Sequence, residues 1–164
     1  MSYWEVLRRL EDIGTPFETG SEEENLAIDR FRALLGDFKA SDFVPRIRQV
    51  YAEDVYFNDT LKTMVGIEAL EAYLEGSAEA LEVGTVEFLD LAVSNGNYYF
   101  RWEMSLRFKK LRRGVLTRSF GMSHIRFDAE GRVVLHQDFW DSASGFFEHV
   151  PMAGGLIRAI KKRL

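Results

Sequence analysis

The feature that most constrains the fold of this chain is the run from Gly131 to Asp141, close to the C-terminal end of the sequence. The pair Glu130–Gly131 predicts a turn, and the β-branched and aromatic residues after it predict a strand over 132–141. This strand carries His136 and Asp138 among apolar neighbours. Because an unpaired carboxylate is costly to bury, the strand must either line a polar pocket or end at solvent.

Composition narrows the class of protein. The 164 residues suffice for one domain with a sizeable core, and 46% of them are apolar. The net charge of −5 argues against nucleic acid as the main partner, because binding phosphates requires a basic surface. The lack of cysteine excludes disulfides, thiolate metal sites and cysteine nucleophiles. Since no secretory signal and no apolar stretch near the ~18 residues of a spanning helix are apparent, we expect a cytoplasmic protein.

The first half of the sequence predicts helices. Residues 1–20 are a lead-in that has the apolar residues for one helical turn. Ser21 followed by Glu24 is a capping box, and apolar residues at helical spacing then predict an amphipathic helix over 22–38. The other elements expected in this half are a helix over 43–51, a strand over 54–59, a loop over 60–65 and a helix over 66–81.

The second half predicts strands. Residues 85–93 alternate between apolar and polar side chains, and Asn95–Gly96 is a strong hairpin signal. The strands expected after it cover 98–109, 115–127 and 132–141. Helices followed by four antiparallel strands predict an α+β fold with the helices on one side of the sheet.

The chain ends in a tail over 143–164 with a short basic helix expected over 156–163. Two interpretations of this helix stay open. It either docks on the sheet or on a partner subunit, or it makes a weak contact with an anionic membrane surface.

The order of these elements, together with several short motifs, resembles the NTF2-like superfamily, which includes SnoaL-like polyketide cyclases, ketosteroid isomerases and limonene-type epoxide hydrolases. The motifs are Tyr51–Asn58, the helix start Gly66–Leu70, Arg101–Trp102 and His136–Asp141. The resemblance implies an NTF2-like (SnoaL-like) domain over 1–142. Its expected shape is a cone, in which a strongly bent antiparallel sheet wraps around about three helices and encloses an apolar cavity. Many members of the superfamily form homodimers through the outer face of the sheet, so a homodimer is expected.

The similarity to limonene-type epoxide hydrolases implies roles for five residues. Asp138 matches the general base, and Tyr56 and Asn58 match the pair that holds the nucleophilic water. Arg101 matches the arginine that orients the site, while Glu103 stands where that family has an aspartate. The additional methylene displaces the acid by about a bond length, and a misplacement of ~1 Å can cost ~100-fold in rate.

Two arrangements of the long strand over 98–109 remain open. Alternation places Arg101 and Glu103 on one face and Trp102 on the other. Either the apolar face packs on the helices and the charged face meets water, or the apolar face forms a dimer contact and the charged face lines the cone. His124 either pairs with Asp138 across a hairpin or is a satisfied structural histidine. The candidates for the lining of the cavity are Trp102, His124 and Trp140.

These observations favour a protein that binds a small hydrophobic molecule. It is expected to be a cofactor-free acid/base enzyme of hydrolase, isomerase or cyclase type, with Asp138 as the pocket carboxylate. The alternative is a non-catalytic ligand-binding or dimeric interaction module. No metal site is expected, because the histidines and carboxylates lack a metal-ligand spacing, and no glycine-rich phosphate loop is present.

Overall fold

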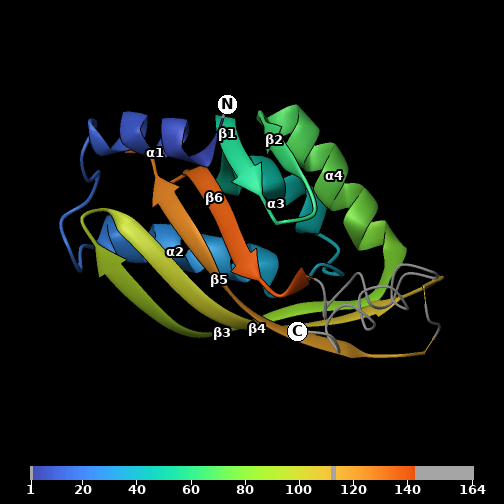
Figure 1. Cartoon of the computed structure of the whole chain (residues 1–164). Coiled ribbons are helices and arrows are strands. Elements are labelled where there is room, and N and C mark those ends of the chain that lie inside the picture. Colours follow the sequence, from blue (N-terminus) through green and yellow to red (C-terminus); the bar gives the residue numbers. More distant parts are fainter. Residues whose placement is uncertain (1, 112–113, 143–164) are drawn as a thin grey trace, which may run out of the picture.

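The structure is a computed structural model that describes residues 2–111 and 114–142, so the helix expected over 156–163 lies outside the described residues. In the described residues three helices precede two strands, and a fourth helix then leads into four consecutive antiparallel strands (Figure 1). No helix in the described part of the chain is both long and apolar enough to cross a membrane. The elements are α1 (Tyr3–Glu11), α2 (Glu22–Leu35), α3 (Phe43–Val50), β1 (Tyr51–Asn58), β2 (Thr63–Val65), α4 (Ile67–Ala80), β3 (Leu81–Ser94), β4 (Asn97–Phe108), β5 (Thr117–Phe127) and β6 (Val133–Trp140).

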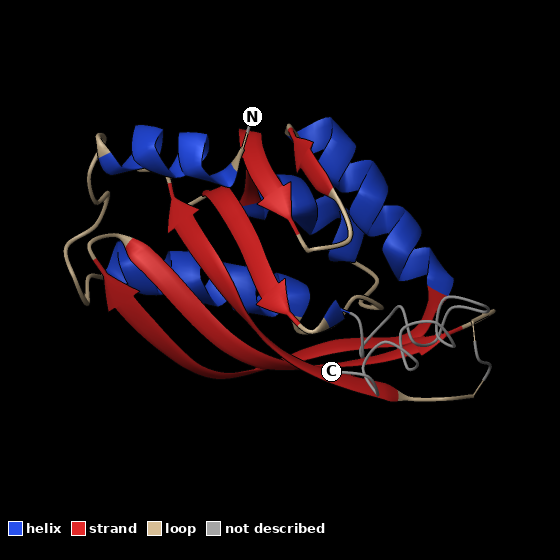
Figure 2. Cartoon of the chain, in the orientation of Figure 1, coloured by secondary structure: helices blue, strands red, loops and turns tan. Residues whose placement is uncertain are grey.

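The strands form a single curved sheet in the order β2-β1-β6-β5-β4-β3 (Figure 2). All neighbours are antiparallel except β1 and β6, which are parallel. The long strands β3, β4 and β5 sweep across the molecule, and the helices α2 and α3 lie against the sheet (Figure 1). This arrangement confirms the expected α+β cone. It adds the short strand β2 to a segment that was expected to be a loop, and one parallel pair to an otherwise antiparallel sheet.

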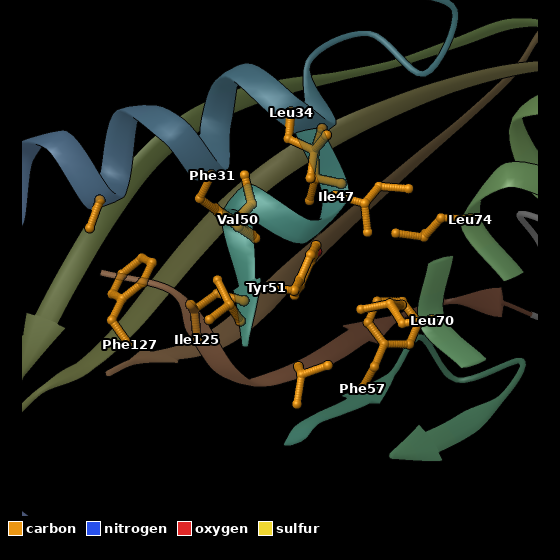
Figure 3. Packing of buried hydrophobic residues seen from close by; sticks show 14 of the residues in the cluster. Phe31, Leu34, Ile47, Val50, Tyr51, Phe57, Leu70, Leu74, Ile125 and Phe127 are labelled. Atoms are coloured by element: carbon orange, nitrogen blue, oxygen red, sulfur yellow. The ribbon is translucent and has the colours of Figure 1, made fainter. Parts of the chain in front are cut away.

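The concave face of the sheet carries the main core. Phe31 of α2, Ile47 of α3 and Leu70 of α4 are completely buried against Phe100 and Ile125 of the sheet. Figure 3 shows side chains from all three helices converging on β1, β5 and β6. Since a fully buried side chain of this size stabilises the fold by about 1.5–3 kcal/mol, this cluster dominates the packing energy of the domain.

A buried carboxylate links α2 to the sheet. The Ser21 side chain accepts a hydrogen bond from the Glu24 amide, as the predicted capping box requires. The Glu24 carboxylate, however, accepts from the Gly20 amide at 2.6 Å and from the Tyr98 hydroxyl at 2.6 Å. Because both carboxylate oxygens have donors, Glu24 is buried in the core without an unpaired charge.

The convex face is covered in part by α1. The lead-in, expected to hold one helical turn, forms a nine-residue helix that starts with a capping box between Ser2 and Glu5. Its apolar side packs on the outer face of the sheet, so the two faces have separate apolar clusters. The members of this second cluster are Val6, Leu7, Leu10, Tyr56 and Leu135.

Candidate functional site

A cavity of about 640 Å³ lies between α4 and the concave face of the sheet. Its size is typical of sites for small organic molecules. The walls are mainly apolar, and they reach the surface near the exposed residues Lys62, Gly76 and Ala80. The large apolar side chains of the lining include Phe57, Phe88, Trp102, Met104, Leu106 and Trp140.

The indole of Trp102 lies directly against β5, because the residue opposite it on that strand is a glycine. Trp102 pairs with Gly121 in the β4–β5 register. A Cβ atom at Gly121 would collide with this indole and with the Cβ of Trp140. The bare strand lets the ring lie across β5, where Nε1–H donates to Ser123 Oγ at 2.9 Å.

Asp138 is the centre of a hydrogen-bond network on the cavity wall. Its Oδ1 accepts from Ser123 Oγ at 2.5 Å and from His136 Nε2 at 2.8 Å. The Nδ1 atom of His136 lies 2.9 Å from the hydroxyl of Tyr51. Burial, followed by the charge of Asp138, raises the pKa of Tyr51 well above its ordinary value, so the phenol stays protonated and donates to Nδ1. Because a phenol that donates to Nδ1 needs a lone pair there, the proton between His136 and Asp138 lies on Nε2 and is donated to Asp138.

The second oxygen of the Asp138 carboxylate is not used by the two hydrogen bonds that hold the first. Both hydrogen bonds to Asp138 end on Oδ1, and Oδ2 has no partner within residues 2–111 and 114–142. The side chain is 15% exposed and lines the cavity. An ionised carboxylate can accept about four hydrogen bonds, so Oδ2 retains the capacity to bind a ligand atom.

A second carboxylate lies at the same cavity, in the turn after β1. Asp59 Oδ2 accepts from the Tyr73 hydroxyl at 2.5 Å, and Asp59 Oδ1 accepts from the amides of Leu61 and Lys62. The carbonyl of Asp59 also accepts from Trp140 Nε1 at 2.7 Å. Burial and the bond to Asp59 raise the pKa of Tyr73. Lys62 Nζ lies 5.0 Å from the centre of the Tyr73 ring, within the range of a cation–π contact.

The structure brings only some of the predicted site residues to the cavity. Asp138, Trp102 and Trp140 line it, as expected. Arg101 and Glu103 lie on the opposite face of β4, where Arg101 pairs with the exposed Asp90. The apolar face of β4 packs against the helices α2, α3 and α4 and forms part of the main core. The arrangement in which the charged face lines the cone is thus wrong.

Tyr56 and Asn58 also lie outside the cavity. On β1 it is Phe57 that points to the concave face, so its two neighbours point away. Tyr56 is buried beneath α1 and donates to Gln137 Oε1 at 3.5 Å, a long contact. Asn58 Nδ2 donates to Thr63 Oγ1 at 2.7 Å within the turn between β1 and β2. The five residues of the epoxide-hydrolase pattern therefore do not converge, and Asp138 alone reaches the cavity.

His124 does not line the cavity, and of its two interpretations the structure supports the satisfied structural histidine. Ser123, not His124, lies opposite Asp138, and His124 lies opposite Gln137. A difference of one residue moves a side chain to the other face of a sheet. The partner of Asp138 from β5 is consequently a serine, and its histidine partner comes from its own strand.

On the convex face, His124 belongs to a separate buried network. Its Nδ1 lies 2.9 Å from the Tyr3 hydroxyl, and its Nε2 lies 2.8 Å from Asn97 Oδ1. Burial and then the neighbouring charge of Arg126 lower the pKa of His124 to about 4. The imidazole is therefore neutral at neutral pH and connects α1 to the sheet.

Sequence reasoning missed four polar residues of the site. Ser123 was out of reach, because a register shift between Arg126 and Phe127 moves the ladder by one residue, and counting back from the turn would pair Asp138 with Met122. The other three come from the helix–strand junction at Tyr51, the turn at Asp59 and the middle of α4 at Tyr73, and neither periodicity nor a motif marks them. Within the described residues, no group of three histidine, aspartate or glutamate side chains is placed to hold a metal ion.

Comparison with known protein families assigns this chain to one of them. The sequence profile of the SnoaL-like domain matches residues 28–136, which is more than half of the chain. A comparison with curated protein sequences found no match.

Solved structures show the same fold at low sequence identity. An LEH-like epoxide hydrolase from M. tuberculosis has a TM-score of 0.63 at 12% identity, over 88% of this chain and 96% of that one. A protein with a ketosteroid isomerase-like fold from Catenulispora acidiphila has a TM-score of 0.62 at 13% identity, over 73% and 88% of the two chains. An NTF2-like protein from Exiguobacterium has a TM-score of 0.57 at 17% identity, over 70% and 98%. Sequence profile and fold together show that this chain belongs to the SnoaL-like domain family of the NTF2-like superfamily.

Proposed function

We propose that this protein binds a small, largely apolar molecule in the cavity between α4 and the sheet, and that Asp138 acts on it as a general base. The observation that carries the proposal is the asymmetry of the Asp138 carboxylate. Oδ1 is held by His136 and Ser123, whereas Oδ2 has no partner in the described chain, and the side chain lines an apolar cavity. A base needs such an oxygen within reach of the proton that it removes.

The neighbours of Asp138 act as positioning residues. His136 and Ser123 fix the carboxylate, and Tyr51 fixes the tautomer and ring orientation of His136. The mainly apolar walls lower the local dielectric constant, which strengthens the electrostatic attraction between Asp138 and the proton of a bound molecule. The reaction class that fits is the activation of a bound water or hydroxyl, whose O–H can donate to Asp138 before its proton is removed.

Binding and turnover are tested separately. The apolar fluorophore N-phenylnaphthylamine should bind the wild-type protein with enhanced emission, and Val86→Trp should prevent binding, because the larger side chain fills the cavity. Turnover of a set of apolar epoxides, which an activated water would open, is then followed by mass spectrometry. Asp138→Asn should keep the fluorophore and lose at least about a hundredfold in turnover. Wild-type protein that does not bind the fluorophore, or binding unaffected by Val86→Trp, would contradict the proposal.

A second candidate is a binding protein without turnover. It is favoured by the hydrogen bonds of the cavity, because the hydroxyls of Tyr73 and Ser123 already donate to Asp59 and Asp138. Few donors then remain to stabilise negative charge that develops on a substrate. Ligands that raise the melting temperature while no substrate is converted would identify this function. The expected homodimer and the membrane contact of the basic tail stay predictions.

A further inference from the structure

We infer that the molecule bound in this cavity presents a hydrogen-bond donor, a hydroxyl or an amine, to Oδ2 of Asp138, and that the cavity discriminates against carbonyl and carboxylate head groups. The inference rests on the proposed function and specifies the chemistry of its ligand. It follows from the direction of each hydrogen bond at the polar end of the cavity.

On the β5–β6 side, every side-chain donor that meets Asp138 is already in use. Trp102 Nε1–H donates to Ser123, and the Ser123 hydroxyl donates to Asp138 Oδ1. The Tyr51 hydroxyl donates to His136, whose Nε2–H donates to the same Oδ1. Two chains of donors thus converge on one oxygen, and what they leave unused is the acceptor Oδ2.

On the α4 side, the donors are used in the same way. The Tyr73 hydroxyl donates to Asp59 Oδ2, and Trp140 Nε1–H donates to the Asp59 carbonyl. The Ser77 hydroxyl donates to the carbonyl of Tyr73 at 2.7 Å. The phenolic oxygen of Tyr73 keeps acceptor capacity, because only its proton is used. This side of the cavity, too, presents acceptors to a ligand.

The charges of the lining agree with this polarity. Two aspartates line the cavity, and Lys62 is the one lysine or arginine among the described residues that does so. Lys62 is exposed at the rim and lies over the Tyr73 ring, away from the deepest part of the site. The polar end is therefore acidic, which disfavours an anionic head group and favours an amine in its protonated form.

A ligand that cannot donate a hydrogen bond to Asp138 Oδ2 loses much of its binding free energy. A carboxylate oxygen removed from water needs a donor, and a hydrogen bond to a charged group is stronger than one between neutral groups. A carbonyl oxygen placed at Oδ2 would bring two acceptors together and leave both unsatisfied. A site that contains a buried polar group rejects an analogue that cannot pair with it more strongly than it rejects a change in apolar shape.

Four probes with the same ring system test the inference: naphthylmethanol, naphthylmethylamine, methyl naphthyl ketone and naphthoate. Isothermal titration calorimetry with the wild-type protein should give dissociation constants for the alcohol and the amine that are at least about tenfold lower than those for the ketone and naphthoate. The comparison of alcohol with amine separates the two donor types. A tighter amine would show that charge adds to the hydrogen bond.

A pair of matched variants assigns the preference to Asp138. In Asp138→Asn the amide offers both a donor and an acceptor, so the preference should fall to less than about threefold. Asp90→Asn makes the same change on the convex face, where Asp90 is exposed beside Arg101, and should leave the preference intact.

The outcomes separate this inference from the proposed function. If the ketone or naphthoate binds the wild-type protein as tightly as the alcohol, or if Asp138→Asn keeps the full preference, the inference is wrong and the cavity remains a binding site. If none of the four probes binds and N-phenylnaphthylamine does not bind either, the proposed function is wrong, and the inference falls with it.

Discussion

The two faces of the sheet each hold a buried histidine in a hydrogen-bond network, and the two networks have different chemistry. On the concave face, Tyr51 donates to His136, which donates to the carboxylate of Asp138. On the convex face, Tyr3 and the amide of Asn97 are the partners of His124. Both rings are buried and both have a tyrosine hydroxyl on Nδ1. Burial of a histidine beside a tyrosine is thus common to both faces and does not by itself mark a functional site.

The difference lies in where each network ends. The concave network ends on an ionisable group that lines a cavity. The convex network continues through Asn97 to Arg126, which donates to the carbonyls of Leu10 and Gly14 and so holds the end of α1. The first arrangement leaves an acceptor open to a ligand, whereas the second satisfies backbone groups. We expect changes on the convex face to affect stability alone, and changes on the concave face to affect ligand binding as well.

The largest effect on stability is expected for Arg126→Leu. This change leaves the carbonyls of Leu10 and Gly14 without their donor in a buried place and should lower the free energy of unfolding by about 2–4 kcal/mol. Urea denaturation measures it. The matched control is Arg101→Leu on the same face, where the pair with Asp90 is exposed and its loss should cost less than about 1 kcal/mol. Equal costs for the two variants would show that Arg126 does not hold α1.

The next effect is a dependence of stability on pH that arises from His124. Its pKa is lowered to about 4 in the folded protein from the ordinary value of 6.5. Between these values the unfolded chain binds a proton that the folded protein does not, so stability falls as the pH drops from 6.5 to 4. The slope from this residue is about 1.4 kcal/mol per pH unit. Denaturation at several pH values should show a shallower fall for His124→Gln, and parallel curves for the two proteins would contradict the assignment.

The smallest effects sharpen the contrast between the faces. Tyr51→Phe and Tyr3→Phe each remove one hydroxyl from a histidine Nδ1 and should cost about 1 kcal/mol or less. Only Tyr51→Phe should also reduce the preference for naphthylmethanol over methyl naphthyl ketone, because the ring of His136 loses the hydroxyl that fixes it, and Asp138 is then held less firmly in the orientation that meets the ligand. Calorimetry with both probes measures this preference. A loss of preference in Tyr3→Phe would break the distinction between the two networks.

The order of elements and the last strand were predictable from sequence, since they follow from hydrophobic periodicity and turn residues. The place of Asp138 on the cavity wall was implied by the resemblance to the NTF2-like superfamily, whereas the residues alone left a pocket and a solvent-exposed strand end open. The Arg101–Glu103 side of β4 was not, because alternation defines two faces without saying which one meets the helices. The choice between the two interpretations of His124 depended on the strand register, in which a difference of one residue decides whether His124 or Ser123 lies opposite Asp138. The roles of Tyr51, Asp59 and Tyr73 depend on contacts between elements distant in sequence, which no local pattern encodes.

The parallel pairing of β1 with β6 determines when, during synthesis and folding, the polar end of the cavity can form. The last described strand does not lie at an edge but inserts between β1 and β5, and it carries His136 and Asp138. During synthesis the helices and the first five strands emerge before either of these residues does. Contacts between such distant segments are slow to form, because a long loop must close first. A chain truncated before Val133 therefore lacks the carboxylate as well as a central strand, and the polar end of the cavity is formed only with the completed sheet.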